Sequence, residues 1–157
     1  MDHSPAEATA YHEAGHAVMA LALGRPVAFV SVLPTRQLLG TCEFGKAVFR
    51  PSEDWLEREM LIALAGLAAE ARFSGNYAWD GAARDQDYAE DLALQRAGTA
   101  RKASRLLRRM LSKAEHLLAQ EENWLAVERM AAELLRVGEI SGRAARHIYE
   151  ECCRQSR

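Results

Sequence analysis

The 157-residue sequence has few cysteines and no hydrophobic run of membrane length. Its three cysteines, Cys42 and the adjacent Cys152 and Cys153, do not form a spaced disulfide framework, which favours a reducing compartment. The longest apolar runs, residues 17–23 and 61–69, are too short to span a bilayer, and the sequence does not open with a signal-peptide pattern. These absences predict a cytoplasmic protein without a transmembrane span.

The sequence also lacks an excess of charge of one sign. Its 20 Lys and Arg residues against 22 Asp and Glu residues give a net charge of −2, which argues against a globally basic nucleic-acid binder. Basic residues do gather at positions 100–113, where helical spacing would place them on one face: Arg101, Lys102, Arg105, Arg108, Arg109 and Lys113. A solvated helix face is the favoured interpretation, and nucleic acid or an acidic partner is the alternative.

Alanine and leucine are abundant, and glycine and proline stand mostly at the ends of predicted elements, so we expect one mostly α domain over residues 1–157. Ser4 and Glu7 form an S-x-x-E capping box for a helix that starts at Pro5 and runs to about residue 23. A small β region should follow, with a strand at 27–33 and a second strand or hairpin at 38–49. The remaining helices are predicted at about 52–75, 85–97, 99–120 and 122–137, with a last one after the cap at 140–142 and a loop at 76–83.

Two histidines and a glutamate stand together in "YHEAGHAV", residues 11–18. Positions i and i+4 of a helix share one face, so His12 and His16 can direct both imidazoles at one zinc ion. Glu13 projects beside this pair, where its carboxylate can take a proton from a water that zinc has acidified. The pattern H-E-x-x-H therefore indicates a zinc-dependent hydrolase. Two surface histidines, or core histidines bonded to backbone carbonyls, are the alternative.

A hydrolytic zinc site needs a third protein ligand and leaves its fourth position for water. The extension H-x-x-G-x-x-H is missing after the motif, so the third ligand should be a carboxylate further along the chain. Spacing leaves four candidates open: Glu70, Asp80, Asp85 and Asp87. Gly15 costs its helix about 1 kcal/mol relative to alanine, which indicates that another group approaches closely there.

Several segments resemble, in order, the FtsH-type ATP-dependent zinc metalloproteases. "TAYHEAGHAV" is similar to their zinc helix, "VAFVSVLPTRQLLGTCEF" to the strand region that follows, and "LAGLAAEARFSG" to their L-x-G-R-x-A-E-x-x-x-F-G helix. "DGAARDQDYAEDLALQRA" resembles T-G-A-S-N-D-[IL]-x-x-A, and "NWLAVERMAAELLRVGEISGRAARHI" resembles their closing helices. The resemblance covers about residues 8–150 and implies a helical, zincin-like peptidase domain.

Carried over by position, this resemblance implies that His12, His16 and Asp85 bind Zn²⁺ and that Glu13 is the catalytic base. It leaves Asp87 as the alternative ligand. Glu70 falls on a family glutamate and is expected either to orient a ligand histidine or to form a solvated pair with a nearby arginine.

The sequence departs from the family pattern at three positions near the implied site. Arg84 stands where the family has asparagine, Asp80 replaces a threonine, and Leu67 replaces an arginine. Family members also carry a membrane anchor and an ATPase module, and this sequence has neither a span nor a G-x-x-x-x-G-K-[ST] loop. We therefore expect a protein or peptide substrate that is already unfolded, or a separate unfoldase or specific partner; an oligomer is compatible with the sequence.

Three functions follow from this reading. The favoured one is a zinc-dependent endopeptidase that cleaves unfolded or flexible segments. The alternatives are a regulatory peptidase that cleaves one partner and a non-catalytic adaptor. If residues 27–33 form an edge strand, an extended substrate could add to it through main-chain hydrogen bonds; packing of that strand inside the fold is the other possibility.

Overall fold

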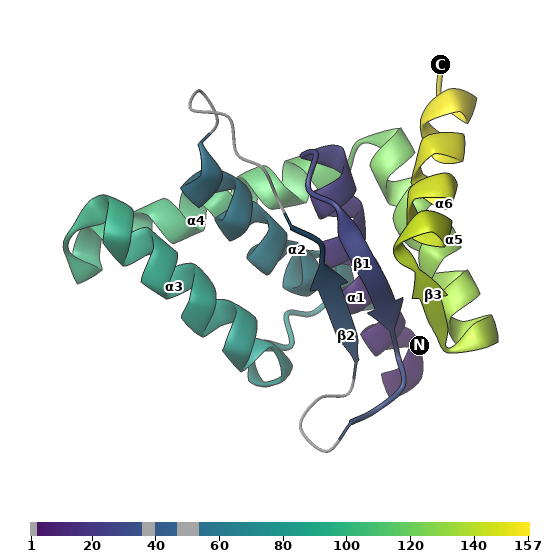
Figure 1. Ribbon diagram of the computed structural model, residues 1–157. Helices are drawn as coiled ribbons and strands as arrows, with labels where there is room; N and C mark the ends of the chain where they lie inside the picture. The colour runs from purple at the N-terminus through teal and green to yellow at the C-terminus, as the bar shows by residue number, and fades with distance from the viewer. Residues whose placement is uncertain (1–2, 36–39, 47–53) are drawn as a thin grey trace.

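The computed structural model describes residues 3–35, 40–46 and 54–157, without the side chains of residues 80 and 81. This part of the chain is mostly helical, as predicted, with a small antiparallel sheet (Figure 1). Its elements are α1 (Pro5–Ala22), β1 (Val27–Ser31), β2 (Thr41–Phe44), α2 (Trp55–Ser74), the 3-10 turn η1 (Trp79–Ala82), α3 (Ala83–Ala97), α4 (Ala100–Leu118), α5 (Glu121–Val137), β3 (Glu139–Ser141) and α6 (Gly142–Gln155). None of the helices in the described ranges is both long and apolar enough to cross a membrane.

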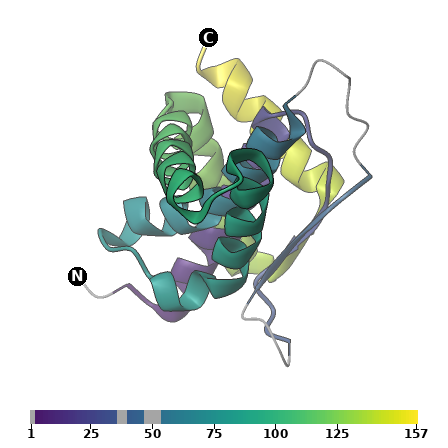
Figure 2. The same ribbon diagram turned by 90° about the vertical axis from the view of Figure 1, so that its left-hand side faces the viewer.

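The helix α1 lies in the middle of the fold and packs against α2, α5 and the sheet. The two views show the sheet on one side of α1, with α3 and α4 on the far side of α2 (Figures 1 and 2). The largest buried cluster takes residues from both ends of the chain, from Ala10 of α1 to Cys152 of α6. The prediction of one domain over residues 1–157 stays a prediction.

The start of α1 matches the sequence prediction. Ser4 accepts a hydrogen bond from the backbone N–H of Glu7 at 3.2 Å, and the Glu7 carboxylate accepts one from the backbone N–H of Ser4 at 3.4 Å. This reciprocal cap satisfies two N–H groups that a helix end otherwise leaves without partners. The helix that carries His12 and His16 therefore has a fixed beginning.

The sheet corrects two predictions. Residues 140–142 were expected only as a helix cap, but residues 139–141 form the strand β3, because they pair with β1 from Phe29 to Ser31. Ser141 does cap α6 by accepting a hydrogen bond from the N–H of Ala144. The strand order is β2-β1-β3, so β1 is the central strand. The hypothesis that residues 27–33 offer an edge to a substrate is therefore wrong, because both edges of β1 are already paired.

Smaller differences concern element ends. The expected strand at 27–33 ends at Ser31, and the second strand covers only Thr41–Phe44; residues 38, 39 and 47–49 of that prediction lie outside the described residues. The expected loop at 76–83 contains the turn η1, and α3 begins at Ala83 rather than at Asp85. Asp85 thus lies in the first turn of a helix, where backbone N–H groups favour a negative charge.

The close approach indicated by Gly15 is a contact between α1 and α2. A β-carbon at Gly15 would lie 2.5 Å from Cβ of Ala69 and 2.6 Å from the carbonyl oxygen of Ala65. The space beside Gly15 is therefore filled by α2. Small residues on both helices let the two backbones come close, which brings side chains of α2 to the histidines of α1.

We expect Gly15→Ala to lower the free energy of unfolding by about 1–3 kcal/mol, because the added methyl group overpacks this contact. In an uncrowded helix the same change would raise it by about 1 kcal/mol. Urea denaturation of the zinc-free protein measures the sign. The matched control is Ala132→Gly on the exposed face of α5, which measures helix propensity alone; stabilisation by Gly15→Ala would contradict the packing argument.

Candidate metal centre

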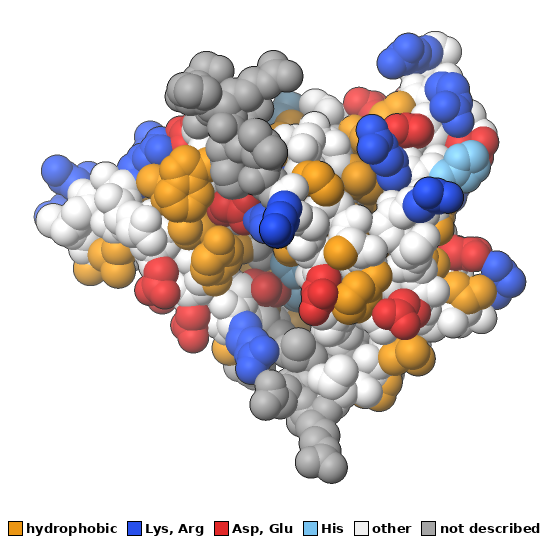
Figure 3. All heavy atoms as spheres, in the orientation of Figure 1, with side chains coloured by type: hydrophobic (Ala, Val, Ile, Leu, Met, Phe, Trp, Pro, Cys, Tyr) orange, Lys and Arg blue, Asp and Glu red, His pale blue; other side chains and the backbone are white. Residues whose placement is uncertain are grey.

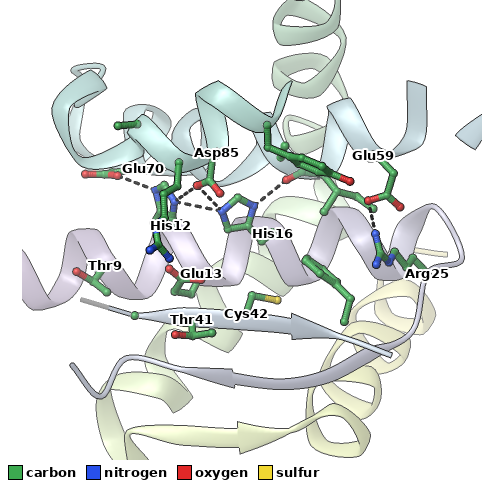
Figure 4. Close-up of a pocket in the computed structure, with 17 residues that line it drawn as sticks. Thr9, His12, Glu13, His16, Arg25, Thr41, Cys42, Glu59, Glu70 and Asp85 are labelled. Atoms are coloured by element: carbon green, nitrogen blue, oxygen red, sulfur yellow. Dashed lines mark hydrogen bonds and ion pairs between the residues drawn. The ribbon is translucent and has the colours of Figure 1, made fainter. Parts of the chain in front are cut away.

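Three side chains from two helices converge at one point beside α1. Nε2 of His12 lies 2.9 Å and Nε2 of His16 lies 3.0 Å from the same oxygen, Oδ2 of Asp85, and the two nitrogens are 3.1 Å apart. The histidines are 8% and 6% exposed, and their rings are close to perpendicular at 78°. Among the residues that the structure describes, these three form the cluster suited to a metal ion (Figure 4).

The other nitrogen of each ring is fixed by a separate group. Nδ1 of His16 lies 2.7 Å from the carbonyl oxygen of Ile62, and Nδ1 of His12 lies 3.0 Å from Oε2 of Glu70. A carbonyl oxygen can only accept, so His16 carries a proton on Nδ1. The Glu70 carboxylate favours the same tautomer of His12. Of the two expectations for Glu70, the geometry matches the one in which it orients a histidine.

The donor set fits a cation. With Nδ1 of each ring protonated, both Nε2 atoms present lone pairs, and so does the carboxylate oxygen of Asp85 that touches them. Three acceptors at 2.9–3.1 Å repel one another unless a positive charge lies between them. Tetrahedral zinc with ligands at 2.0–2.1 Å spaces their atoms about 3.3 Å apart, so an outward shift of a few tenths of an ångström would accommodate it.

The protonation of the site shows the same preference for positive charge. Burial opposes a charge on His12, but its hydrogen bonds to Asp85 and Glu70 outweigh burial and raise the pKa of His12 to about 10. Burial likewise opposes a charge on His16, whose pKa the Asp85 carboxylate raises. Burial also works against an ionised Asp85, yet the two imidazoles lower its pKa well below the usual value. A proton in this position stands where a metal ion would bind.

Gly66 of α2 leaves the space that the two rings occupy. A β-carbon at this position would lie 2.4 Å from Nε2 of His16 and 2.8 Å from Nε2 of His12. Even alanine would therefore displace the atoms that converge on Asp85. The segment "LAGLAAE" predicted a glycine within the second helix. Only the packing of α2 on α1 shows that this glycine makes room for the two imidazole rings.

Glu13 lies beside the three converging atoms but is not one of them. Its side chain is on the part of α1 that faces β2, close to Thr41 and Cys42 (Figure 4), and a β-carbon at Gly40 would lie 3.0 Å from its Cγ. Glu13 is 8% exposed, and burial raises the pKa of its carboxyl group. A buried carboxylate with a raised pKa, placed next to a metal centre, is suited to accept and return a proton.

The structure separates the four candidates for a third ligand. It brings Asp85 to both histidines and Glu70 to the far nitrogen of His12. Asp87 lies exposed on α3, outside the cluster. The side chain of Asp80 lies outside what the structure describes.

The centre lies in a cleft of about 630 Å³ between the helices and β2. Histidine side chains are visible at the bottom of a hollow in the middle of the molecule in Figure 3. The cleft also reaches residues that the sequence did not single out, among them Arg25, Phe44, Glu59 and Tyr88. They come from four different parts of the chain, so no short sequence pattern could predict that they lie together.

Sequence comparison with known proteins identifies the family to which this chain is related. The sequence profile of peptidase family M41 matches residues 1–100, a range that contains both histidines, Glu13 and Asp85. The chain belongs to peptidase family M41. Members of this family are zinc metallopeptidases. A chloroplastic relative from Medicago sativa, named ATP-dependent zinc metalloprotease FTSH, is 36% identical over 83 residues, which cover 48% of this chain and 12% of that protein. The resemblance drawn from the motifs is confirmed over residues 1–100, and the likeness of the closing helices beyond them stays a prediction. This chain spans a small part of that relative's length.

Replacing Asp85 by asparagine should weaken zinc binding by more than about 100-fold, beyond the 10–100-fold typical of a group that only orients a ligand. Asp87→Asn is the matched control, because it makes the same chemical change two residues away on an exposed position. Chelator competition measures both affinities. If Asp87→Asn lost zinc and Asp85→Asn kept it, the ligand assignment would be reversed.

Zinc affinity should rise with pH across the neutral range. The pKa of His12 is raised to about 10 and that of His16 is raised as well, so the metal-free site holds at least one proton at pH 7 that zinc must displace. Each displaced proton makes the apparent affinity about tenfold higher per pH unit. Chelator competition at pH 6, 7 and 8 gives the slope; a Kd that stays constant over this range would contradict the proton count.

Proposed function

We propose that this chain is a zinc-dependent metalloendopeptidase domain that hydrolyses peptide bonds in unfolded or flexible segments. The observation that carries the proposal is the position of Glu13. Its carboxylate is buried in the cleft that holds the three converging ligand atoms, but it is not part of that cluster. An adaptor has no chemical need for a buried carboxylate there. Zinc would supply Lewis acidity, which acidifies water and polarises the scissile carbonyl.

The protein residues divide the remaining work. His12, His16 and Asp85 would hold the metal, while Glu70 and the carbonyl of Ile62 keep the two rings oriented. Glu13 would take the proton of the attacking water and deliver it to the leaving amine. Its raised pKa keeps the carboxyl group able to hold that proton during the reaction.

The substrate would lie along β2. This strand is at the edge of the sheet, and Thr41, Cys42 and Phe44 line the cleft. Main-chain hydrogen bonds to an open strand edge recognise an extended peptide whatever its side chains, which suits unfolded segments. The edge-strand docking that the sequence suggested for residues 27–33 is therefore proposed for β2. A separate unfoldase or partner, the cytoplasmic location and an oligomer stay predictions.

Glu13→Gln should keep zinc and lose at least about a thousandfold in kcat, because the amide cannot accept the proton. Zinc content and hydrolysis of unfolded casein are measured on the wild type, Glu13→Gln and His16→Ala. We expect His16→Ala to lose both zinc and activity. Equal casein hydrolysis by the wild type and Glu13→Gln would overturn the role of Glu13, and a zinc-loaded wild type that leaves casein intact would favour the single-partner regulatory peptidase.

A further inference from the structure

The cleft continues past His16 to an ion pair that the proposed chemistry does not use. Nη1 of Arg25, which follows the end of α1, donates to Oε2 of Glu59 on α2. The Glu59 side chain is only 5% exposed, whereas that of Arg25 is 20% exposed. Both residues line the cleft, and the guanidinium is the more exposed partner of the pair (Figure 4).

The guanidinium is held in place, and not all of its N–H donors are used by the residues that the structure describes. Its Cζ lies 4.7 Å from the centre of the Phe44 ring, which fixes the plane of the group. Nη1 is engaged by Glu59, and Nε is buried without a hydrogen-bond partner among the described residues. Among the described residues Nη2 has no hydrogen-bond partner, so this nitrogen can meet a molecule in the cleft. A guanidinium fixed on one side and open on the other is suited to bind a carboxylate.

The position of Arg25 along the cleft suits a residue near the scissile bond. α1 rises about 1.5 Å per residue, so its end at Ala22 lies about 9 Å beyond His16. An extended peptide advances about 3.3 Å per residue, which brings Arg25 within about three residues of the bond beside the metal centre. The walls of this end, Phe44 and Tyr88, would contact the apolar part of a side chain.

We propose that Arg25 is a specificity-determining residue, which binds a carboxylate of the substrate on the His16 side of the scissile bond. The carboxylate belongs to an acidic side chain or to the C-terminus of a peptide. This inference rests on the proposed peptidase function. Among the described acidic residues of the cleft, Glu70 and Asp85 contact histidines, and Glu59 binds Arg25 through Oε2 while its Oε1 is buried.

The test uses peptides that are identical except for Glu, Gln or Lys at one of the three positions on each side of the scissile bond. A further pair differs only in a free or amidated C-terminus. Values of kcat/KM are measured with the zinc-loaded wild type, and Kd values with Glu13→Gln. We expect Glu or a free C-terminus to be favoured at least about tenfold at one position, the scale of a charge-assisted hydrogen bond.

Two variants separate recognition from structure. Arg25→Gln should abolish the preference for a carboxylate while zinc content stays the same. The double exchange Arg25→Glu with Glu59→Arg keeps an ion pair but reverses the charge that faces the cleft, so the preference should change to Lys. Arg84→Gln is the matched control, since Arg84 is another cation that lines the cleft, and it should leave the preference in place.

The outcomes are distinguishable. A preference that persists in Arg25→Gln, or that disappears in Arg84→Gln instead, would overturn the assignment and leave the Arg25–Glu59 pair as a purely structural link between α1 and α2. Equal Kd values for all peptides would do the same. Absence of cleavage for every peptide would overturn the peptidase proposal, while the Kd values still decide whether Arg25 recognises a carboxylate.

Discussion

The mutual repulsion of three hydrogen-bond acceptors is the constraint on which the rest of this structure depends. Two imidazole nitrogens and a carboxylate oxygen lie within 3.1 Å of one another in a mostly buried position. Such an arrangement is stable only with a cation at its centre or with protons in its place. Everything around it serves to keep these atoms together: the cap that starts α1, the two Nδ1 partners, and the glycine that leaves room for the rings.

The sequence predicted the parts of this arrangement that depend on local spacing. His12, Glu13 and His16 stand on one helical turn, and the capping box at Ser4 and Glu7 marks where that helix begins. The third candidate ligand comes from a segment about 70 residues away in the sequence, so spacing left it open among four carboxylates. The family resemblance pointed to Asp85, and the structure brings Asp85 to the histidines while Asp87 stays exposed.

What the sequence could not predict is set by contacts between distant segments. The three residues of β3 have no pattern of their own and become a strand because β1 offers a partner. That pairing makes β1 central and leaves β2, beside the cleft, as one of the two edge strands of the described sheet. The ion pair between Arg25 and Glu59 could likewise not be predicted from hydrophobic periodicity. Its two residues are 34 positions apart, and each resembles an ordinary surface residue in the sequence.

Gly66 makes the geometry of the candidate metal centre depend on the register of α1 and α2. One residue of slippage would turn α2 by about 100° and put the side chain of a neighbour, Ala65 or Leu67, where the imidazoles now lie. Binding of an ion thus favours one alignment of α1 and α2 over every other. The absorption spectrum of a bound ion such as cobalt would consequently report on helix alignment. It would change when a substitution anywhere along the contact between the two helices shifts one helix against the other.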